Sequence, residues 1–400
     1  TCVSPFFIIL NCYKVKKMSE INNYTATTLY GLEKVLYDEL TQIGASSIET
    51  GNRCVYFSGD KTILYKSNMK LRTALKILKT ERVFNANNEK ILYHQASKIK
   101  WDSIFNVHDT FSVSSTVNSK FFNHSKYTSL VIKDAIVDQF KKFHNNRPSV
   151  DIKSPDYNIN LHITNKQCNI SINSSGQSLH KRGYRLNQFK APINEVLAAG
   201  IILLSGWDKK VNFIDPMCGS GTFLIEAAMI ATNKAPNLKR KSFGFKKWKN
   251  FDISLYEKIK QDLKKEEKQY DKYICGFDIA ASSVAISRNN CQNSGLEKII
   301  KVDGANFFKS QNHNNCFLMF NPPYGRRISY RPDYYKEIGD VLKHNYQNST
   351  AWIISSEINE LKKIGLRPSR KIKLFNGQLE CRLIKFDMYP GSSSSKLLSE

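Results

Sequence analysis

Residues 213–228 have the sequence FIDPMCGSGTFLIEAA, and this stretch decides the fold of the chain. The apolar run that ends at Ile214 is suited to a buried parallel strand, and helical spacing begins at Thr222. Between them lies a turn with Gly219 and Gly221, which have no Cβ and let a ligand approach the backbone. A strand, a glycine turn and a helix in this order build the nucleotide pocket of a doubly wound α/β sheet, and the helix N-terminus offers free N–H groups to an anion.

The spacing of the glycines distinguishes several kinds of nucleotide-binding turn. A dinucleotide fingerprint needs a third glycine where this chain has Leu224, and a phosphate loop needs a Gly-Lys-Ser/Thr that is missing here. The sequence DPMCGSGT instead resembles the first motif of class I S-adenosylmethionine-dependent methyltransferases, in which the helix end faces the methionine carboxylate. The alternative is a tight strand–helix turn without a ligand. The resemblance implies S-adenosylmethionine as cofactor and the following cofactor-binding residues in the turn: Asp215, Pro216, Cys218, Gly219, Ser220, Gly221 and Thr222.

Two acidic residues follow at the ends of the next predicted strands. Asp278 ends the strand 274–278, where its carboxylate is placed to accept hydrogen bonds from both ribose hydroxyls. The alternative for Asp278 is a cap on the helix that follows. Asp303 ends the strand predicted from Ile299 to Val302, and the resemblance implies that an acid there meets the adenine amino group.

The second landmark is the apolar strand 317–320 followed by Asn321, Pro322, Pro323 and Tyr324. This motif resembles the methyltransferase signature for methylating a planar amino nitrogen, whose lone pair is delocalised into the ring. The Asn321 side-chain oxygen and the Pro322 carbonyl can each accept one N–H and aim the lone pair at the methyl group, while the prolines keep the turn rigid. Tyr324 can stack on the target nucleobase. Carbonyl dipoles, and not a strong general base, stabilise the positive charge that develops on the nitrogen. These four residues are the predicted catalytic set, and Asn321 is also predicted to bind the cofactor; the alternative is a proline-rich turn without a ligand.

Composition favours a nucleic-acid partner. The chain has 400 residues and a formal net charge of +25, an excess that is usually retained for a polyanion. No apolar run approaches the ~20 residues that span a bilayer, so a membrane is not expected. The 9 cysteines are scattered without a C-x-x-C pair, which indicates reduced thiols in a cytoplasmic protein and no metal site. For Cys218 a packing role is favoured over a nucleophile.

The N-terminal half predicts a small α+β unit and a second unit after it. Strands are predicted at 24–28, 54–57, 77–83 and 111–117, helices at 31–43, 61–71 and 128–144, and a hairpin from 158–164 and 168–173. Their order resembles a ferredoxin-like lead-in followed by a THUMP domain, an RNA-binding module of modification enzymes. Basic residues with interleaved aromatic residues recur there, which favours RNA contact over a merely solvated face.

The linker 176–190 contains His180, Lys181, Arg182 and Arg185, and the next helix is expected to have Pro192 in its first turn. This segment resembles the junction between THUMP and methyltransferase domains in bacterial large-subunit ribosomal RNA guanine-N2 methyltransferases. Lys181, Arg182 and Arg185 are predicted to contact RNA phosphates. His180 is interpreted as a junction contact rather than a catalytic base.

A basic insertion, 235–270, separates the first strand–helix unit from the strand at 274–278. Its aromatic and basic start, 242–248, fits either a charged surface helix or an RNA contact. Near the end of the chain, a helix at 334–344, a strand at 350–355 and an antiparallel hairpin at 370–388 complete the pattern of a class I methyltransferase sheet.

The sequence therefore predicts an α/β fold: a Rossmann-like class I methyltransferase domain with a mostly parallel seven-stranded sheet, preceded by an α+β ferredoxin-like and THUMP region. The expected boundaries are an extension at 1–17, a ferredoxin-like lead-in at 18–75, a THUMP domain at 76–175, a linker at 176–190, a methyltransferase domain at 191–390 and a disordered tail at 391–400. Some family members carry a second methyltransferase domain. This chain ends without room for one, so a single activity is expected.

The resemblance implies methyl transfer from S-adenosylmethionine to the exocyclic N2 amine of a guanine in RNA, most readily 23S ribosomal RNA. Three alternatives stay open: a transfer RNA guanine-N2 methyltransferase, an adenine-N6 DNA methyltransferase, and an RNA-binding assembly factor that keeps the pocket without catalysis.

Overall fold

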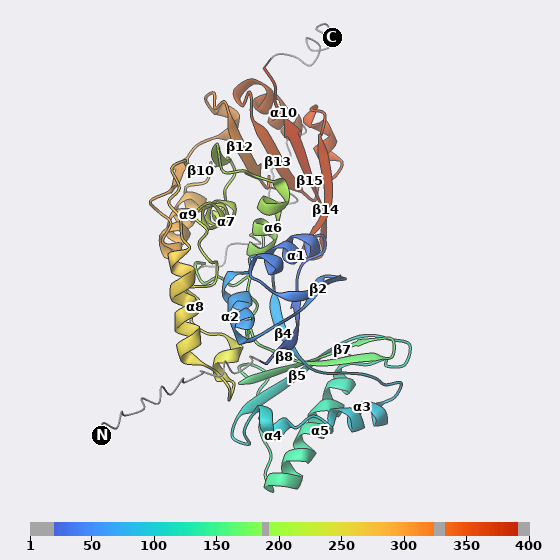
Figure 1. Ribbon diagram of the computed structural model, residues 1–400. Helices are drawn as coiled ribbons and strands as arrows, with labels where there is room; N and C mark the ends of the chain where they lie inside the picture. Colours follow the sequence, from blue (N-terminus) through green and yellow to red (C-terminus); the bar gives the residue numbers. More distant parts are fainter. Residues whose placement is uncertain (1–19, 186–191, 324–332, 391–400) are drawn as a thin grey trace, which may run out of the picture.

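The computed structural model describes residues 20–185, 192–323 and 333–390, and its strands form two β-sheets (Figure 1). In Figure 1 the sheet of the N-terminal half lies below the sheet of the C-terminal half. The expectations for the extension at 1–17 and the tail at 391–400 lie outside the described residues. Among the described residues, every helix is too short or too polar to span a bilayer.

The first sheet has eight strands in the order β2-β3-β1-β4-β8-β7-β5-β6. Their bounds are β1 (Asn22–Thr27), β2 (Ser46–Gly51), β3 (Cys54–Gly59), β4 (Lys76–Asn85), β5 (Thr110–Asn118), β6 (Ser149–Val150), β7 (Tyr157–Thr164) and β8 (Gln167–Asn173). Strand β4 pairs antiparallel with β1 on one side and with β8 on the other, with a register shift between Thr80 and Arg82. Because β4 is shared, the two N-terminal units form one continuous sheet.

Five helices cover this sheet: α1 (Glu33–Gln42), α2 (Lys61–Lys70), α3 (Glu89–Ala96), α4 (Trp101–Ile104) and α5 (Ser125–His144). Side-chain caps fix two of their starts, since Asp60 accepts from Ile63 N at the start of α2 and Asn88 accepts from Ile91 N at the start of α3. Buried residues of α3, α4 and α5 pack with those of β5, β7 and β8 in one apolar cluster, so these elements share a core.

The second sheet has seven strands in the order β11-β10-β9-β12-β13-β15-β14. Their bounds are β9 (Asn212–Asp215), β10 (Ile274–Asp278), β11 (Ile300–Gly304), β12 (Cys316–Phe320), β13 (Thr350–Ser355), β14 (Arg370–Asn376) and β15 (Leu379–Asp387). Strands β9 to β13 are parallel, and β15 joins β13 and β14 antiparallel. The predicted fold class, with its terminal hairpin, is confirmed.

Helices lie on both faces of this sheet: α6 (Glu195–Ser205), α7 (Thr222–Ala231) and α9 (Ala281–Ser294) on one face, and α10 (Tyr334–Asn345) on the other. Alternate residues of β12 serve the two cores, because Phe317 and Met319 join the α6–α7 cluster whereas Leu318 and Phe320 join the α10 cluster. A strand buried on both faces is what a continuous apolar run predicts.

The start of α6 corrects one expectation. The Asn194 side chain accepts hydrogen bonds from Val196 N at 2.9 Å and Leu197 N at 3.3 Å, so the helix begins at Glu195. Pro192 therefore precedes the helix and is not in its first turn.

Strands β2 and β6 and helices α3 and α4 were not predicted from the sequence. Strand β2 has the sequence SSIETG, is largely exposed, and lies at an edge of its sheet, so it carries little apolar alternation. Strand β6 has only two residues, and α4 only four. Periodicity cannot detect segments this short or this polar.

The basic insertion joins the two halves of the molecule. Its short helix η1 (Gly244–Lys247) and helix α8 (Ile253–Lys265) follow one another, and α8 contacts α2 in the N-terminal half (Figure 1). Phe243 and Phe245 are buried, and the Phe245 ring stacks on Tyr65 with centroids 4.5 Å apart. The aromatic side chains at the start of the insertion are therefore packing groups, which corrects the alternative that they contact RNA.

Candidate active site

The first candidate turn connects β9 to α7 and is held by backbone hydrogen bonds. Cys218 N donates to Phe277 O at 2.9 Å, which ties the turn to β10, and Gly221 N donates to Cys218 O at 2.8 Å. Gly219 and Gly221 both have positive φ, +52° and +77°, a conformation that L side chains rarely adopt. A Cβ on Gly221 would overlap Ser287 Oγ of α9, whereas a Cβ on Gly219 would have no atom of the described residues within 4 Å. The turn is closed on the Gly221 side and open at Gly219.

The N-terminus of α7 has backbone N–H groups without a partner in their own helix. Its first i→i−4 bond runs from Ile225 N to Gly221 O, so the preceding N–H groups of the first turn have no acceptor within the helix. Asn290 of α9 donates to Ser220 O at 2.9 Å and holds the other end of the turn. Open space beside Gly219 and these donors fit the carboxylate of a small ligand.

Asp278 contacts this turn from the end of β10. One carboxylate oxygen accepts from Gly219 N at 2.9 Å, and the other accepts from Ala280 N at 2.9 Å. The N-cap residue of α9 is Ala280, and among the residues that the structure describes no side chain caps that helix. Asp278 is therefore a neighbour of the glycine turn rather than the helix cap, and its assignment to the ribose stays a prediction.

Two further acids lie at this edge. The Asp215 carboxyl is buried and accepts from Met217 N at 3.2 Å; burial, and secondarily the charge of Asp278, raises its pKa well above the usual range. Asp303 is exposed and is held by Arg288 of α9, whose Nη2 lies 3.0 Å from the carboxylate. Its contact with adenine stays a prediction.

Cys218 shows no sign of a nucleophile. It is buried, and burial raises the pKa of its thiol, so the uncharged form is favoured. This environment agrees with the predicted packing role.

The second candidate turn lies at the same edge of the sheet as the first. Strand β12 pairs parallel with β9, with Leu318 opposite Ile214, so the residues after Phe320 leave the sheet beside those after Asp215. Asn321 is half-buried, Pro322 is buried and Pro323 is exposed. Tyr324 lies outside the described residues. The catalytic roles of these residues stay predictions. The two turns follow adjacent parallel strands, and neighbouring strands of a sheet lie about 4.8 Å apart.

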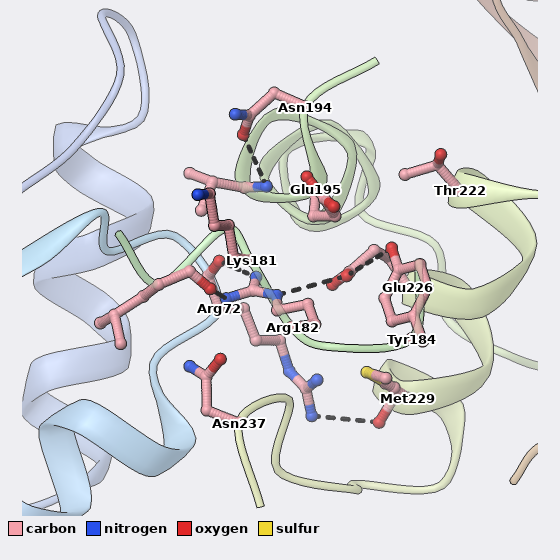
Figure 2. A network of polar contacts seen from close by, with 12 residues as sticks. Arg72, Lys181, Arg182, Tyr184, Asn194, Glu195, Thr222, Glu226, Met229 and Asn237 are labelled. Atoms are coloured by element: carbon pink, nitrogen blue, oxygen red, sulfur yellow. Dashed lines mark hydrogen bonds and ion pairs between the residues drawn. The ribbon is translucent and has the colours of Figure 1, made fainter. Parts of the chain in front are cut away.

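The linker residues are placed differently from one another. Lys181 is exposed and stays a predicted RNA contact. The Arg182 side chain is 0% exposed, and its guanidinium bonds Leu179 O at 2.9 Å, Arg72 O at 2.5 Å and Glu226 Oε1 at 3.4 Å (Figure 2). The prediction that Arg182 contacts RNA is wrong, because its donors are used inside the protein.

A buried polar network around Arg182 was not predicted. Glu226 is the only charged residue of the apolar helix α7, and it also accepts from Tyr184 Oη at 3.3 Å. Arg72, near the end of α2, donates to Met229 O at 3.0 Å, so the N-terminal half is bonded to α7 (Figure 2). A lone acid in an apolar helix is a signal that could have indicated a buried cationic partner.

His180 lies at the junction, as interpreted from the sequence. Its Nδ1 is 2.8 Å from Ser178 Oγ. Burial, and then the charges of Arg182 and Lys181, lowers its pKa to about 4. The imidazole is therefore neutral at pH 7.

Three family models match the chain. They are described as the RlmL ferredoxin-like domain at residues 23–78, the THUMP domain at 86–173 and the RMKL-like methyltransferase domain at 182–385. The predicted resemblance to these three modules is confirmed.

Two relatives show how far the similarity extends. A Synechocystis protein named as a candidate RNA methyltransferase, slr0064, is 36% identical over 92% of this chain and 97% of its own length. The ribosomal RNA large subunit methyltransferase K/L of Buchnera aphidicola is 35% identical over 94% of this chain and 55% of its own length. The chain thus spans about half the length of the K/L protein.

Solved structures give the same fold. SMU.472, a candidate methyltransferase in complex with SAH, has a TM-score of 0.83 and 31% identity over 94% of this chain and 100% of that chain. A Listeria monocytogenes protein named as a predicted N6-adenine-specific DNA methylase has a TM-score of 0.83 and 26% identity over 92% of this chain and 97% of that chain.

The closed side of the glycine turn gives a stability prediction. Gly221→Ala should destabilise the protein by the ~1–3 kcal/mol of a strained backbone and a further ~1–3 kcal/mol of overpacking against Ser287. Gly206→Ala is the matched control, because Gly206 has a similar φ of +70° and no atom of the described residues lies within 4 Å of an added Cβ. Urea unfolding of both variants measures the difference, and adding Ser287→Ala to Gly221→Ala should restore part of it. Equal costs for the two glycines would contradict the packing seen here.

The lowered pKa of His180 gives a pH prediction. In the unfolded state the His180 imidazole has an ordinary pKa of 6.5, whereas in the folded state its pKa is about 4. Between these two pH values the unfolded state therefore binds a proton that the folded state does not. The contribution of His180 to stability is therefore complete above pH 6.5 and is lost as the pH falls from 6.5 to 4. Thermal unfolding of the wild type and His180→Gln across this range should show a shallower acid slope for the variant; identical slopes would refute the shift.

Proposed function

The chain belongs to the family of RMKL-like methyltransferases, and on this premise we propose that it transfers a methyl group from S-adenosylmethionine to the exocyclic N2 amine of a guanine in large-subunit ribosomal RNA. The relatives named K/L support the ribosomal RNA substrate. This chain spans about half of the length of these relatives, so the activity in their names is proposed for this chain and not established by the similarity.

One observation carries the proposal: the glycine turn and the Asn-Pro-Pro turn leave adjacent parallel strands at one edge of the sheet. The open side of a parallel α/β sheet, at the carboxyl ends of its strands, is where such folds bind ligands. A methyl donor on the first turn and an amine on the second would then be close enough to react.

The cofactor is S-adenosylmethionine, as the family and the neighbour solved with SAH support. It supplies a methyl group on a positively charged sulfur. We assign the free N–H groups at the start of α7 to its carboxylate, Asp278 to its ribose and Asp303 to its adenine. The remaining predicted contacts come from the turn itself: Asp215, Pro216, Cys218, Gly219, Ser220, Gly221 and Thr222.

The acceptor amine is assigned to the second turn. The Asn321 side-chain oxygen and the Pro322 carbonyl would each accept one N–H and hold the nitrogen with its lone pair facing the methyl group. Neither group needs to be a strong base, because the methylated nitrogen becomes acidic and releases a proton. Alignment and preorganised dipoles supply the rate. Tyr324 is proposed to stack on the base.

RNA binding is assigned to the N-terminal half and the linker. The THUMP match and the net charge of +25 support an RNA partner, and exposed Lys181 lies in the segment that joins the two halves. A base inside a helix would have to leave its stack to reach the site.

The alternative favoured by a specific observation is adenine-N6 methylation of DNA, because the Listeria neighbour carries that name. An Asn-Pro-Pro-Tyr turn serves either amine. The THUMP domain favours RNA over DNA. Transfer RNA, and a non-catalytic role in assembly, are the remaining alternatives.

Mass spectrometry of nucleosides tests the proposal. Large-subunit ribosomal RNA from cells that lack the gene is incubated with the protein and S-adenosylmethionine, and N2-methylguanosine is expected. Asn321→Ala should lower the rate by ~100- to 1,000-fold, since it removes one preorganised acceptor. SAH affinity measured by calorimetry should fall far less, because Asn321 is only one of the predicted cofactor contacts.

Exposed Asn250 provides the matched control, and Asn250→Ala should keep the wild-type rate. N6-methyladenine in DNA, with no product in RNA, would establish the alternative. Full activity of Asn321→Ala would refute the assigned chemistry.

A further inference from the structure

Arg185 is the last described residue of the linker, and its side chain points into the methyltransferase domain. Nη2 donates to Thr222 Oγ1 at 2.5 Å and to Ile193 O at 3.1 Å, and Nη1 lies 3.0 Å from Glu195 Oε1. Only 17% of the Arg185 side chain and 5% of the Glu195 side chain are exposed. These contacts leave Arg185 poorly placed for the RNA phosphate predicted from the sequence.

Thr222 is the first residue of α7 and follows Gly221 directly. Its hydroxyl also lies 3.3 Å from Ser220 Oγ, so the guanidinium, Thr222 and Ser220 form a chain that ends in the glycine turn. Glu195 pairs with the Arg185 guanidinium at 3.0 Å and offsets its charge, so Arg185 acts on the start of α7 mainly through its hydrogen bond to Thr222.

The linker holds α7 at a second point. Arg182 and Tyr184 bond Glu226, which follows Thr222 by four residues and therefore lies one turn further along the same side of the helix. Two linker arginines thus fix the direction and the start of the helix that carries the cofactor turn.

We propose that Arg185 is a positioning residue of the cofactor site: through Thr222 it fixes the first turn of α7 and makes it receptive to the carboxylate of the bound cofactor. This inference rests on the proposed function, because the proposed function places the methionine carboxylate at that turn. The proposed cofactor site would then include a residue of the linker that joins the N-terminal half to the methyltransferase domain.

Two ligands separate the carboxylate end from the rest of the cofactor. SAH carries the amino-acid portion, whereas 5′-methylthioadenosine keeps the adenosine and the sulfur but has no carboxylate. Calorimetry with Arg185→Met should show SAH affinity reduced by ~10- to 100-fold, the range for losing a hydrogen bond to a charged group, with methylthioadenosine affinity unchanged within about twofold. Arg185→Lys, which keeps the charge, should recover part of the SAH affinity.

The control is Arg367→Met, because Arg367 is exposed and lies outside the candidate site; both ligands should bind this variant as they bind the wild type. Melting temperatures identify misfolded variants, and Arg185→Lys keeps the test usable if Arg185→Met unfolds. An equal loss of both ligands would overturn the proposal in favour of a purely structural role. Reduced RNA affinity with unchanged SAH affinity would overturn it in favour of RNA contact. Failure of the wild type to bind SAH would instead remove the proposed function itself.

Discussion

The parallel pairing of β9 with β10 and β12 is the constraint on which the site depends. Parallel strands end at one edge, so the residues after Asp215, Asp278 and Phe320 gather there although they are far apart in the chain. The register is fixed by burial, because a shift by one residue would turn the apolar side chains of β12 to the wrong faces. The geometry of the site is thus a consequence of core packing.

A buried ionic junction connects this edge to the N-terminal half. Arg182 bonds the Arg72 carbonyl of one half and Glu226 of the other, and Arg185 reaches Thr222. Burying a charge is costly unless it is paired, and removing one partner of such a pair typically costs about 3–5 kcal/mol. The network therefore favours one arrangement of the two halves over others, and it places the ferredoxin-like and THUMP modules at a set position relative to the glycine turn.

The sequence predicted the parts of the fold that depend on local pattern. The sequence indicated the apolar strands β10, β12 and β13 and the glycine turn. These features depend on the pattern of residues that are neighbours in the chain, so they can be recognised without the tertiary structure. Edge strand β2 and the burial of Arg182 were not, because polar composition is ambiguous without its tertiary surroundings. An arginine in a linker has the same sequence signature whether it meets a phosphate or Glu226. Likewise, the sequence alone is compatible with RNA contact by the aromatic residues before α8, whereas the structure shows that Phe245 stacks on Tyr65 inside the protein.

The central claim is that one small molecule can lie across the two turns with an aromatic amine at its methyl end. The most direct measurement is calorimetry with a bisubstrate analogue. In this analogue a short alkyl chain links guanine N2 to the atom that takes the place of the cofactor sulfur. This analogue should bind at least ~10-fold more tightly than SAH, because the guanine is tethered to the bound cofactor portion, and Asn321→Ala should abolish that gain in affinity. An analogue that binds no better than SAH would contradict the account.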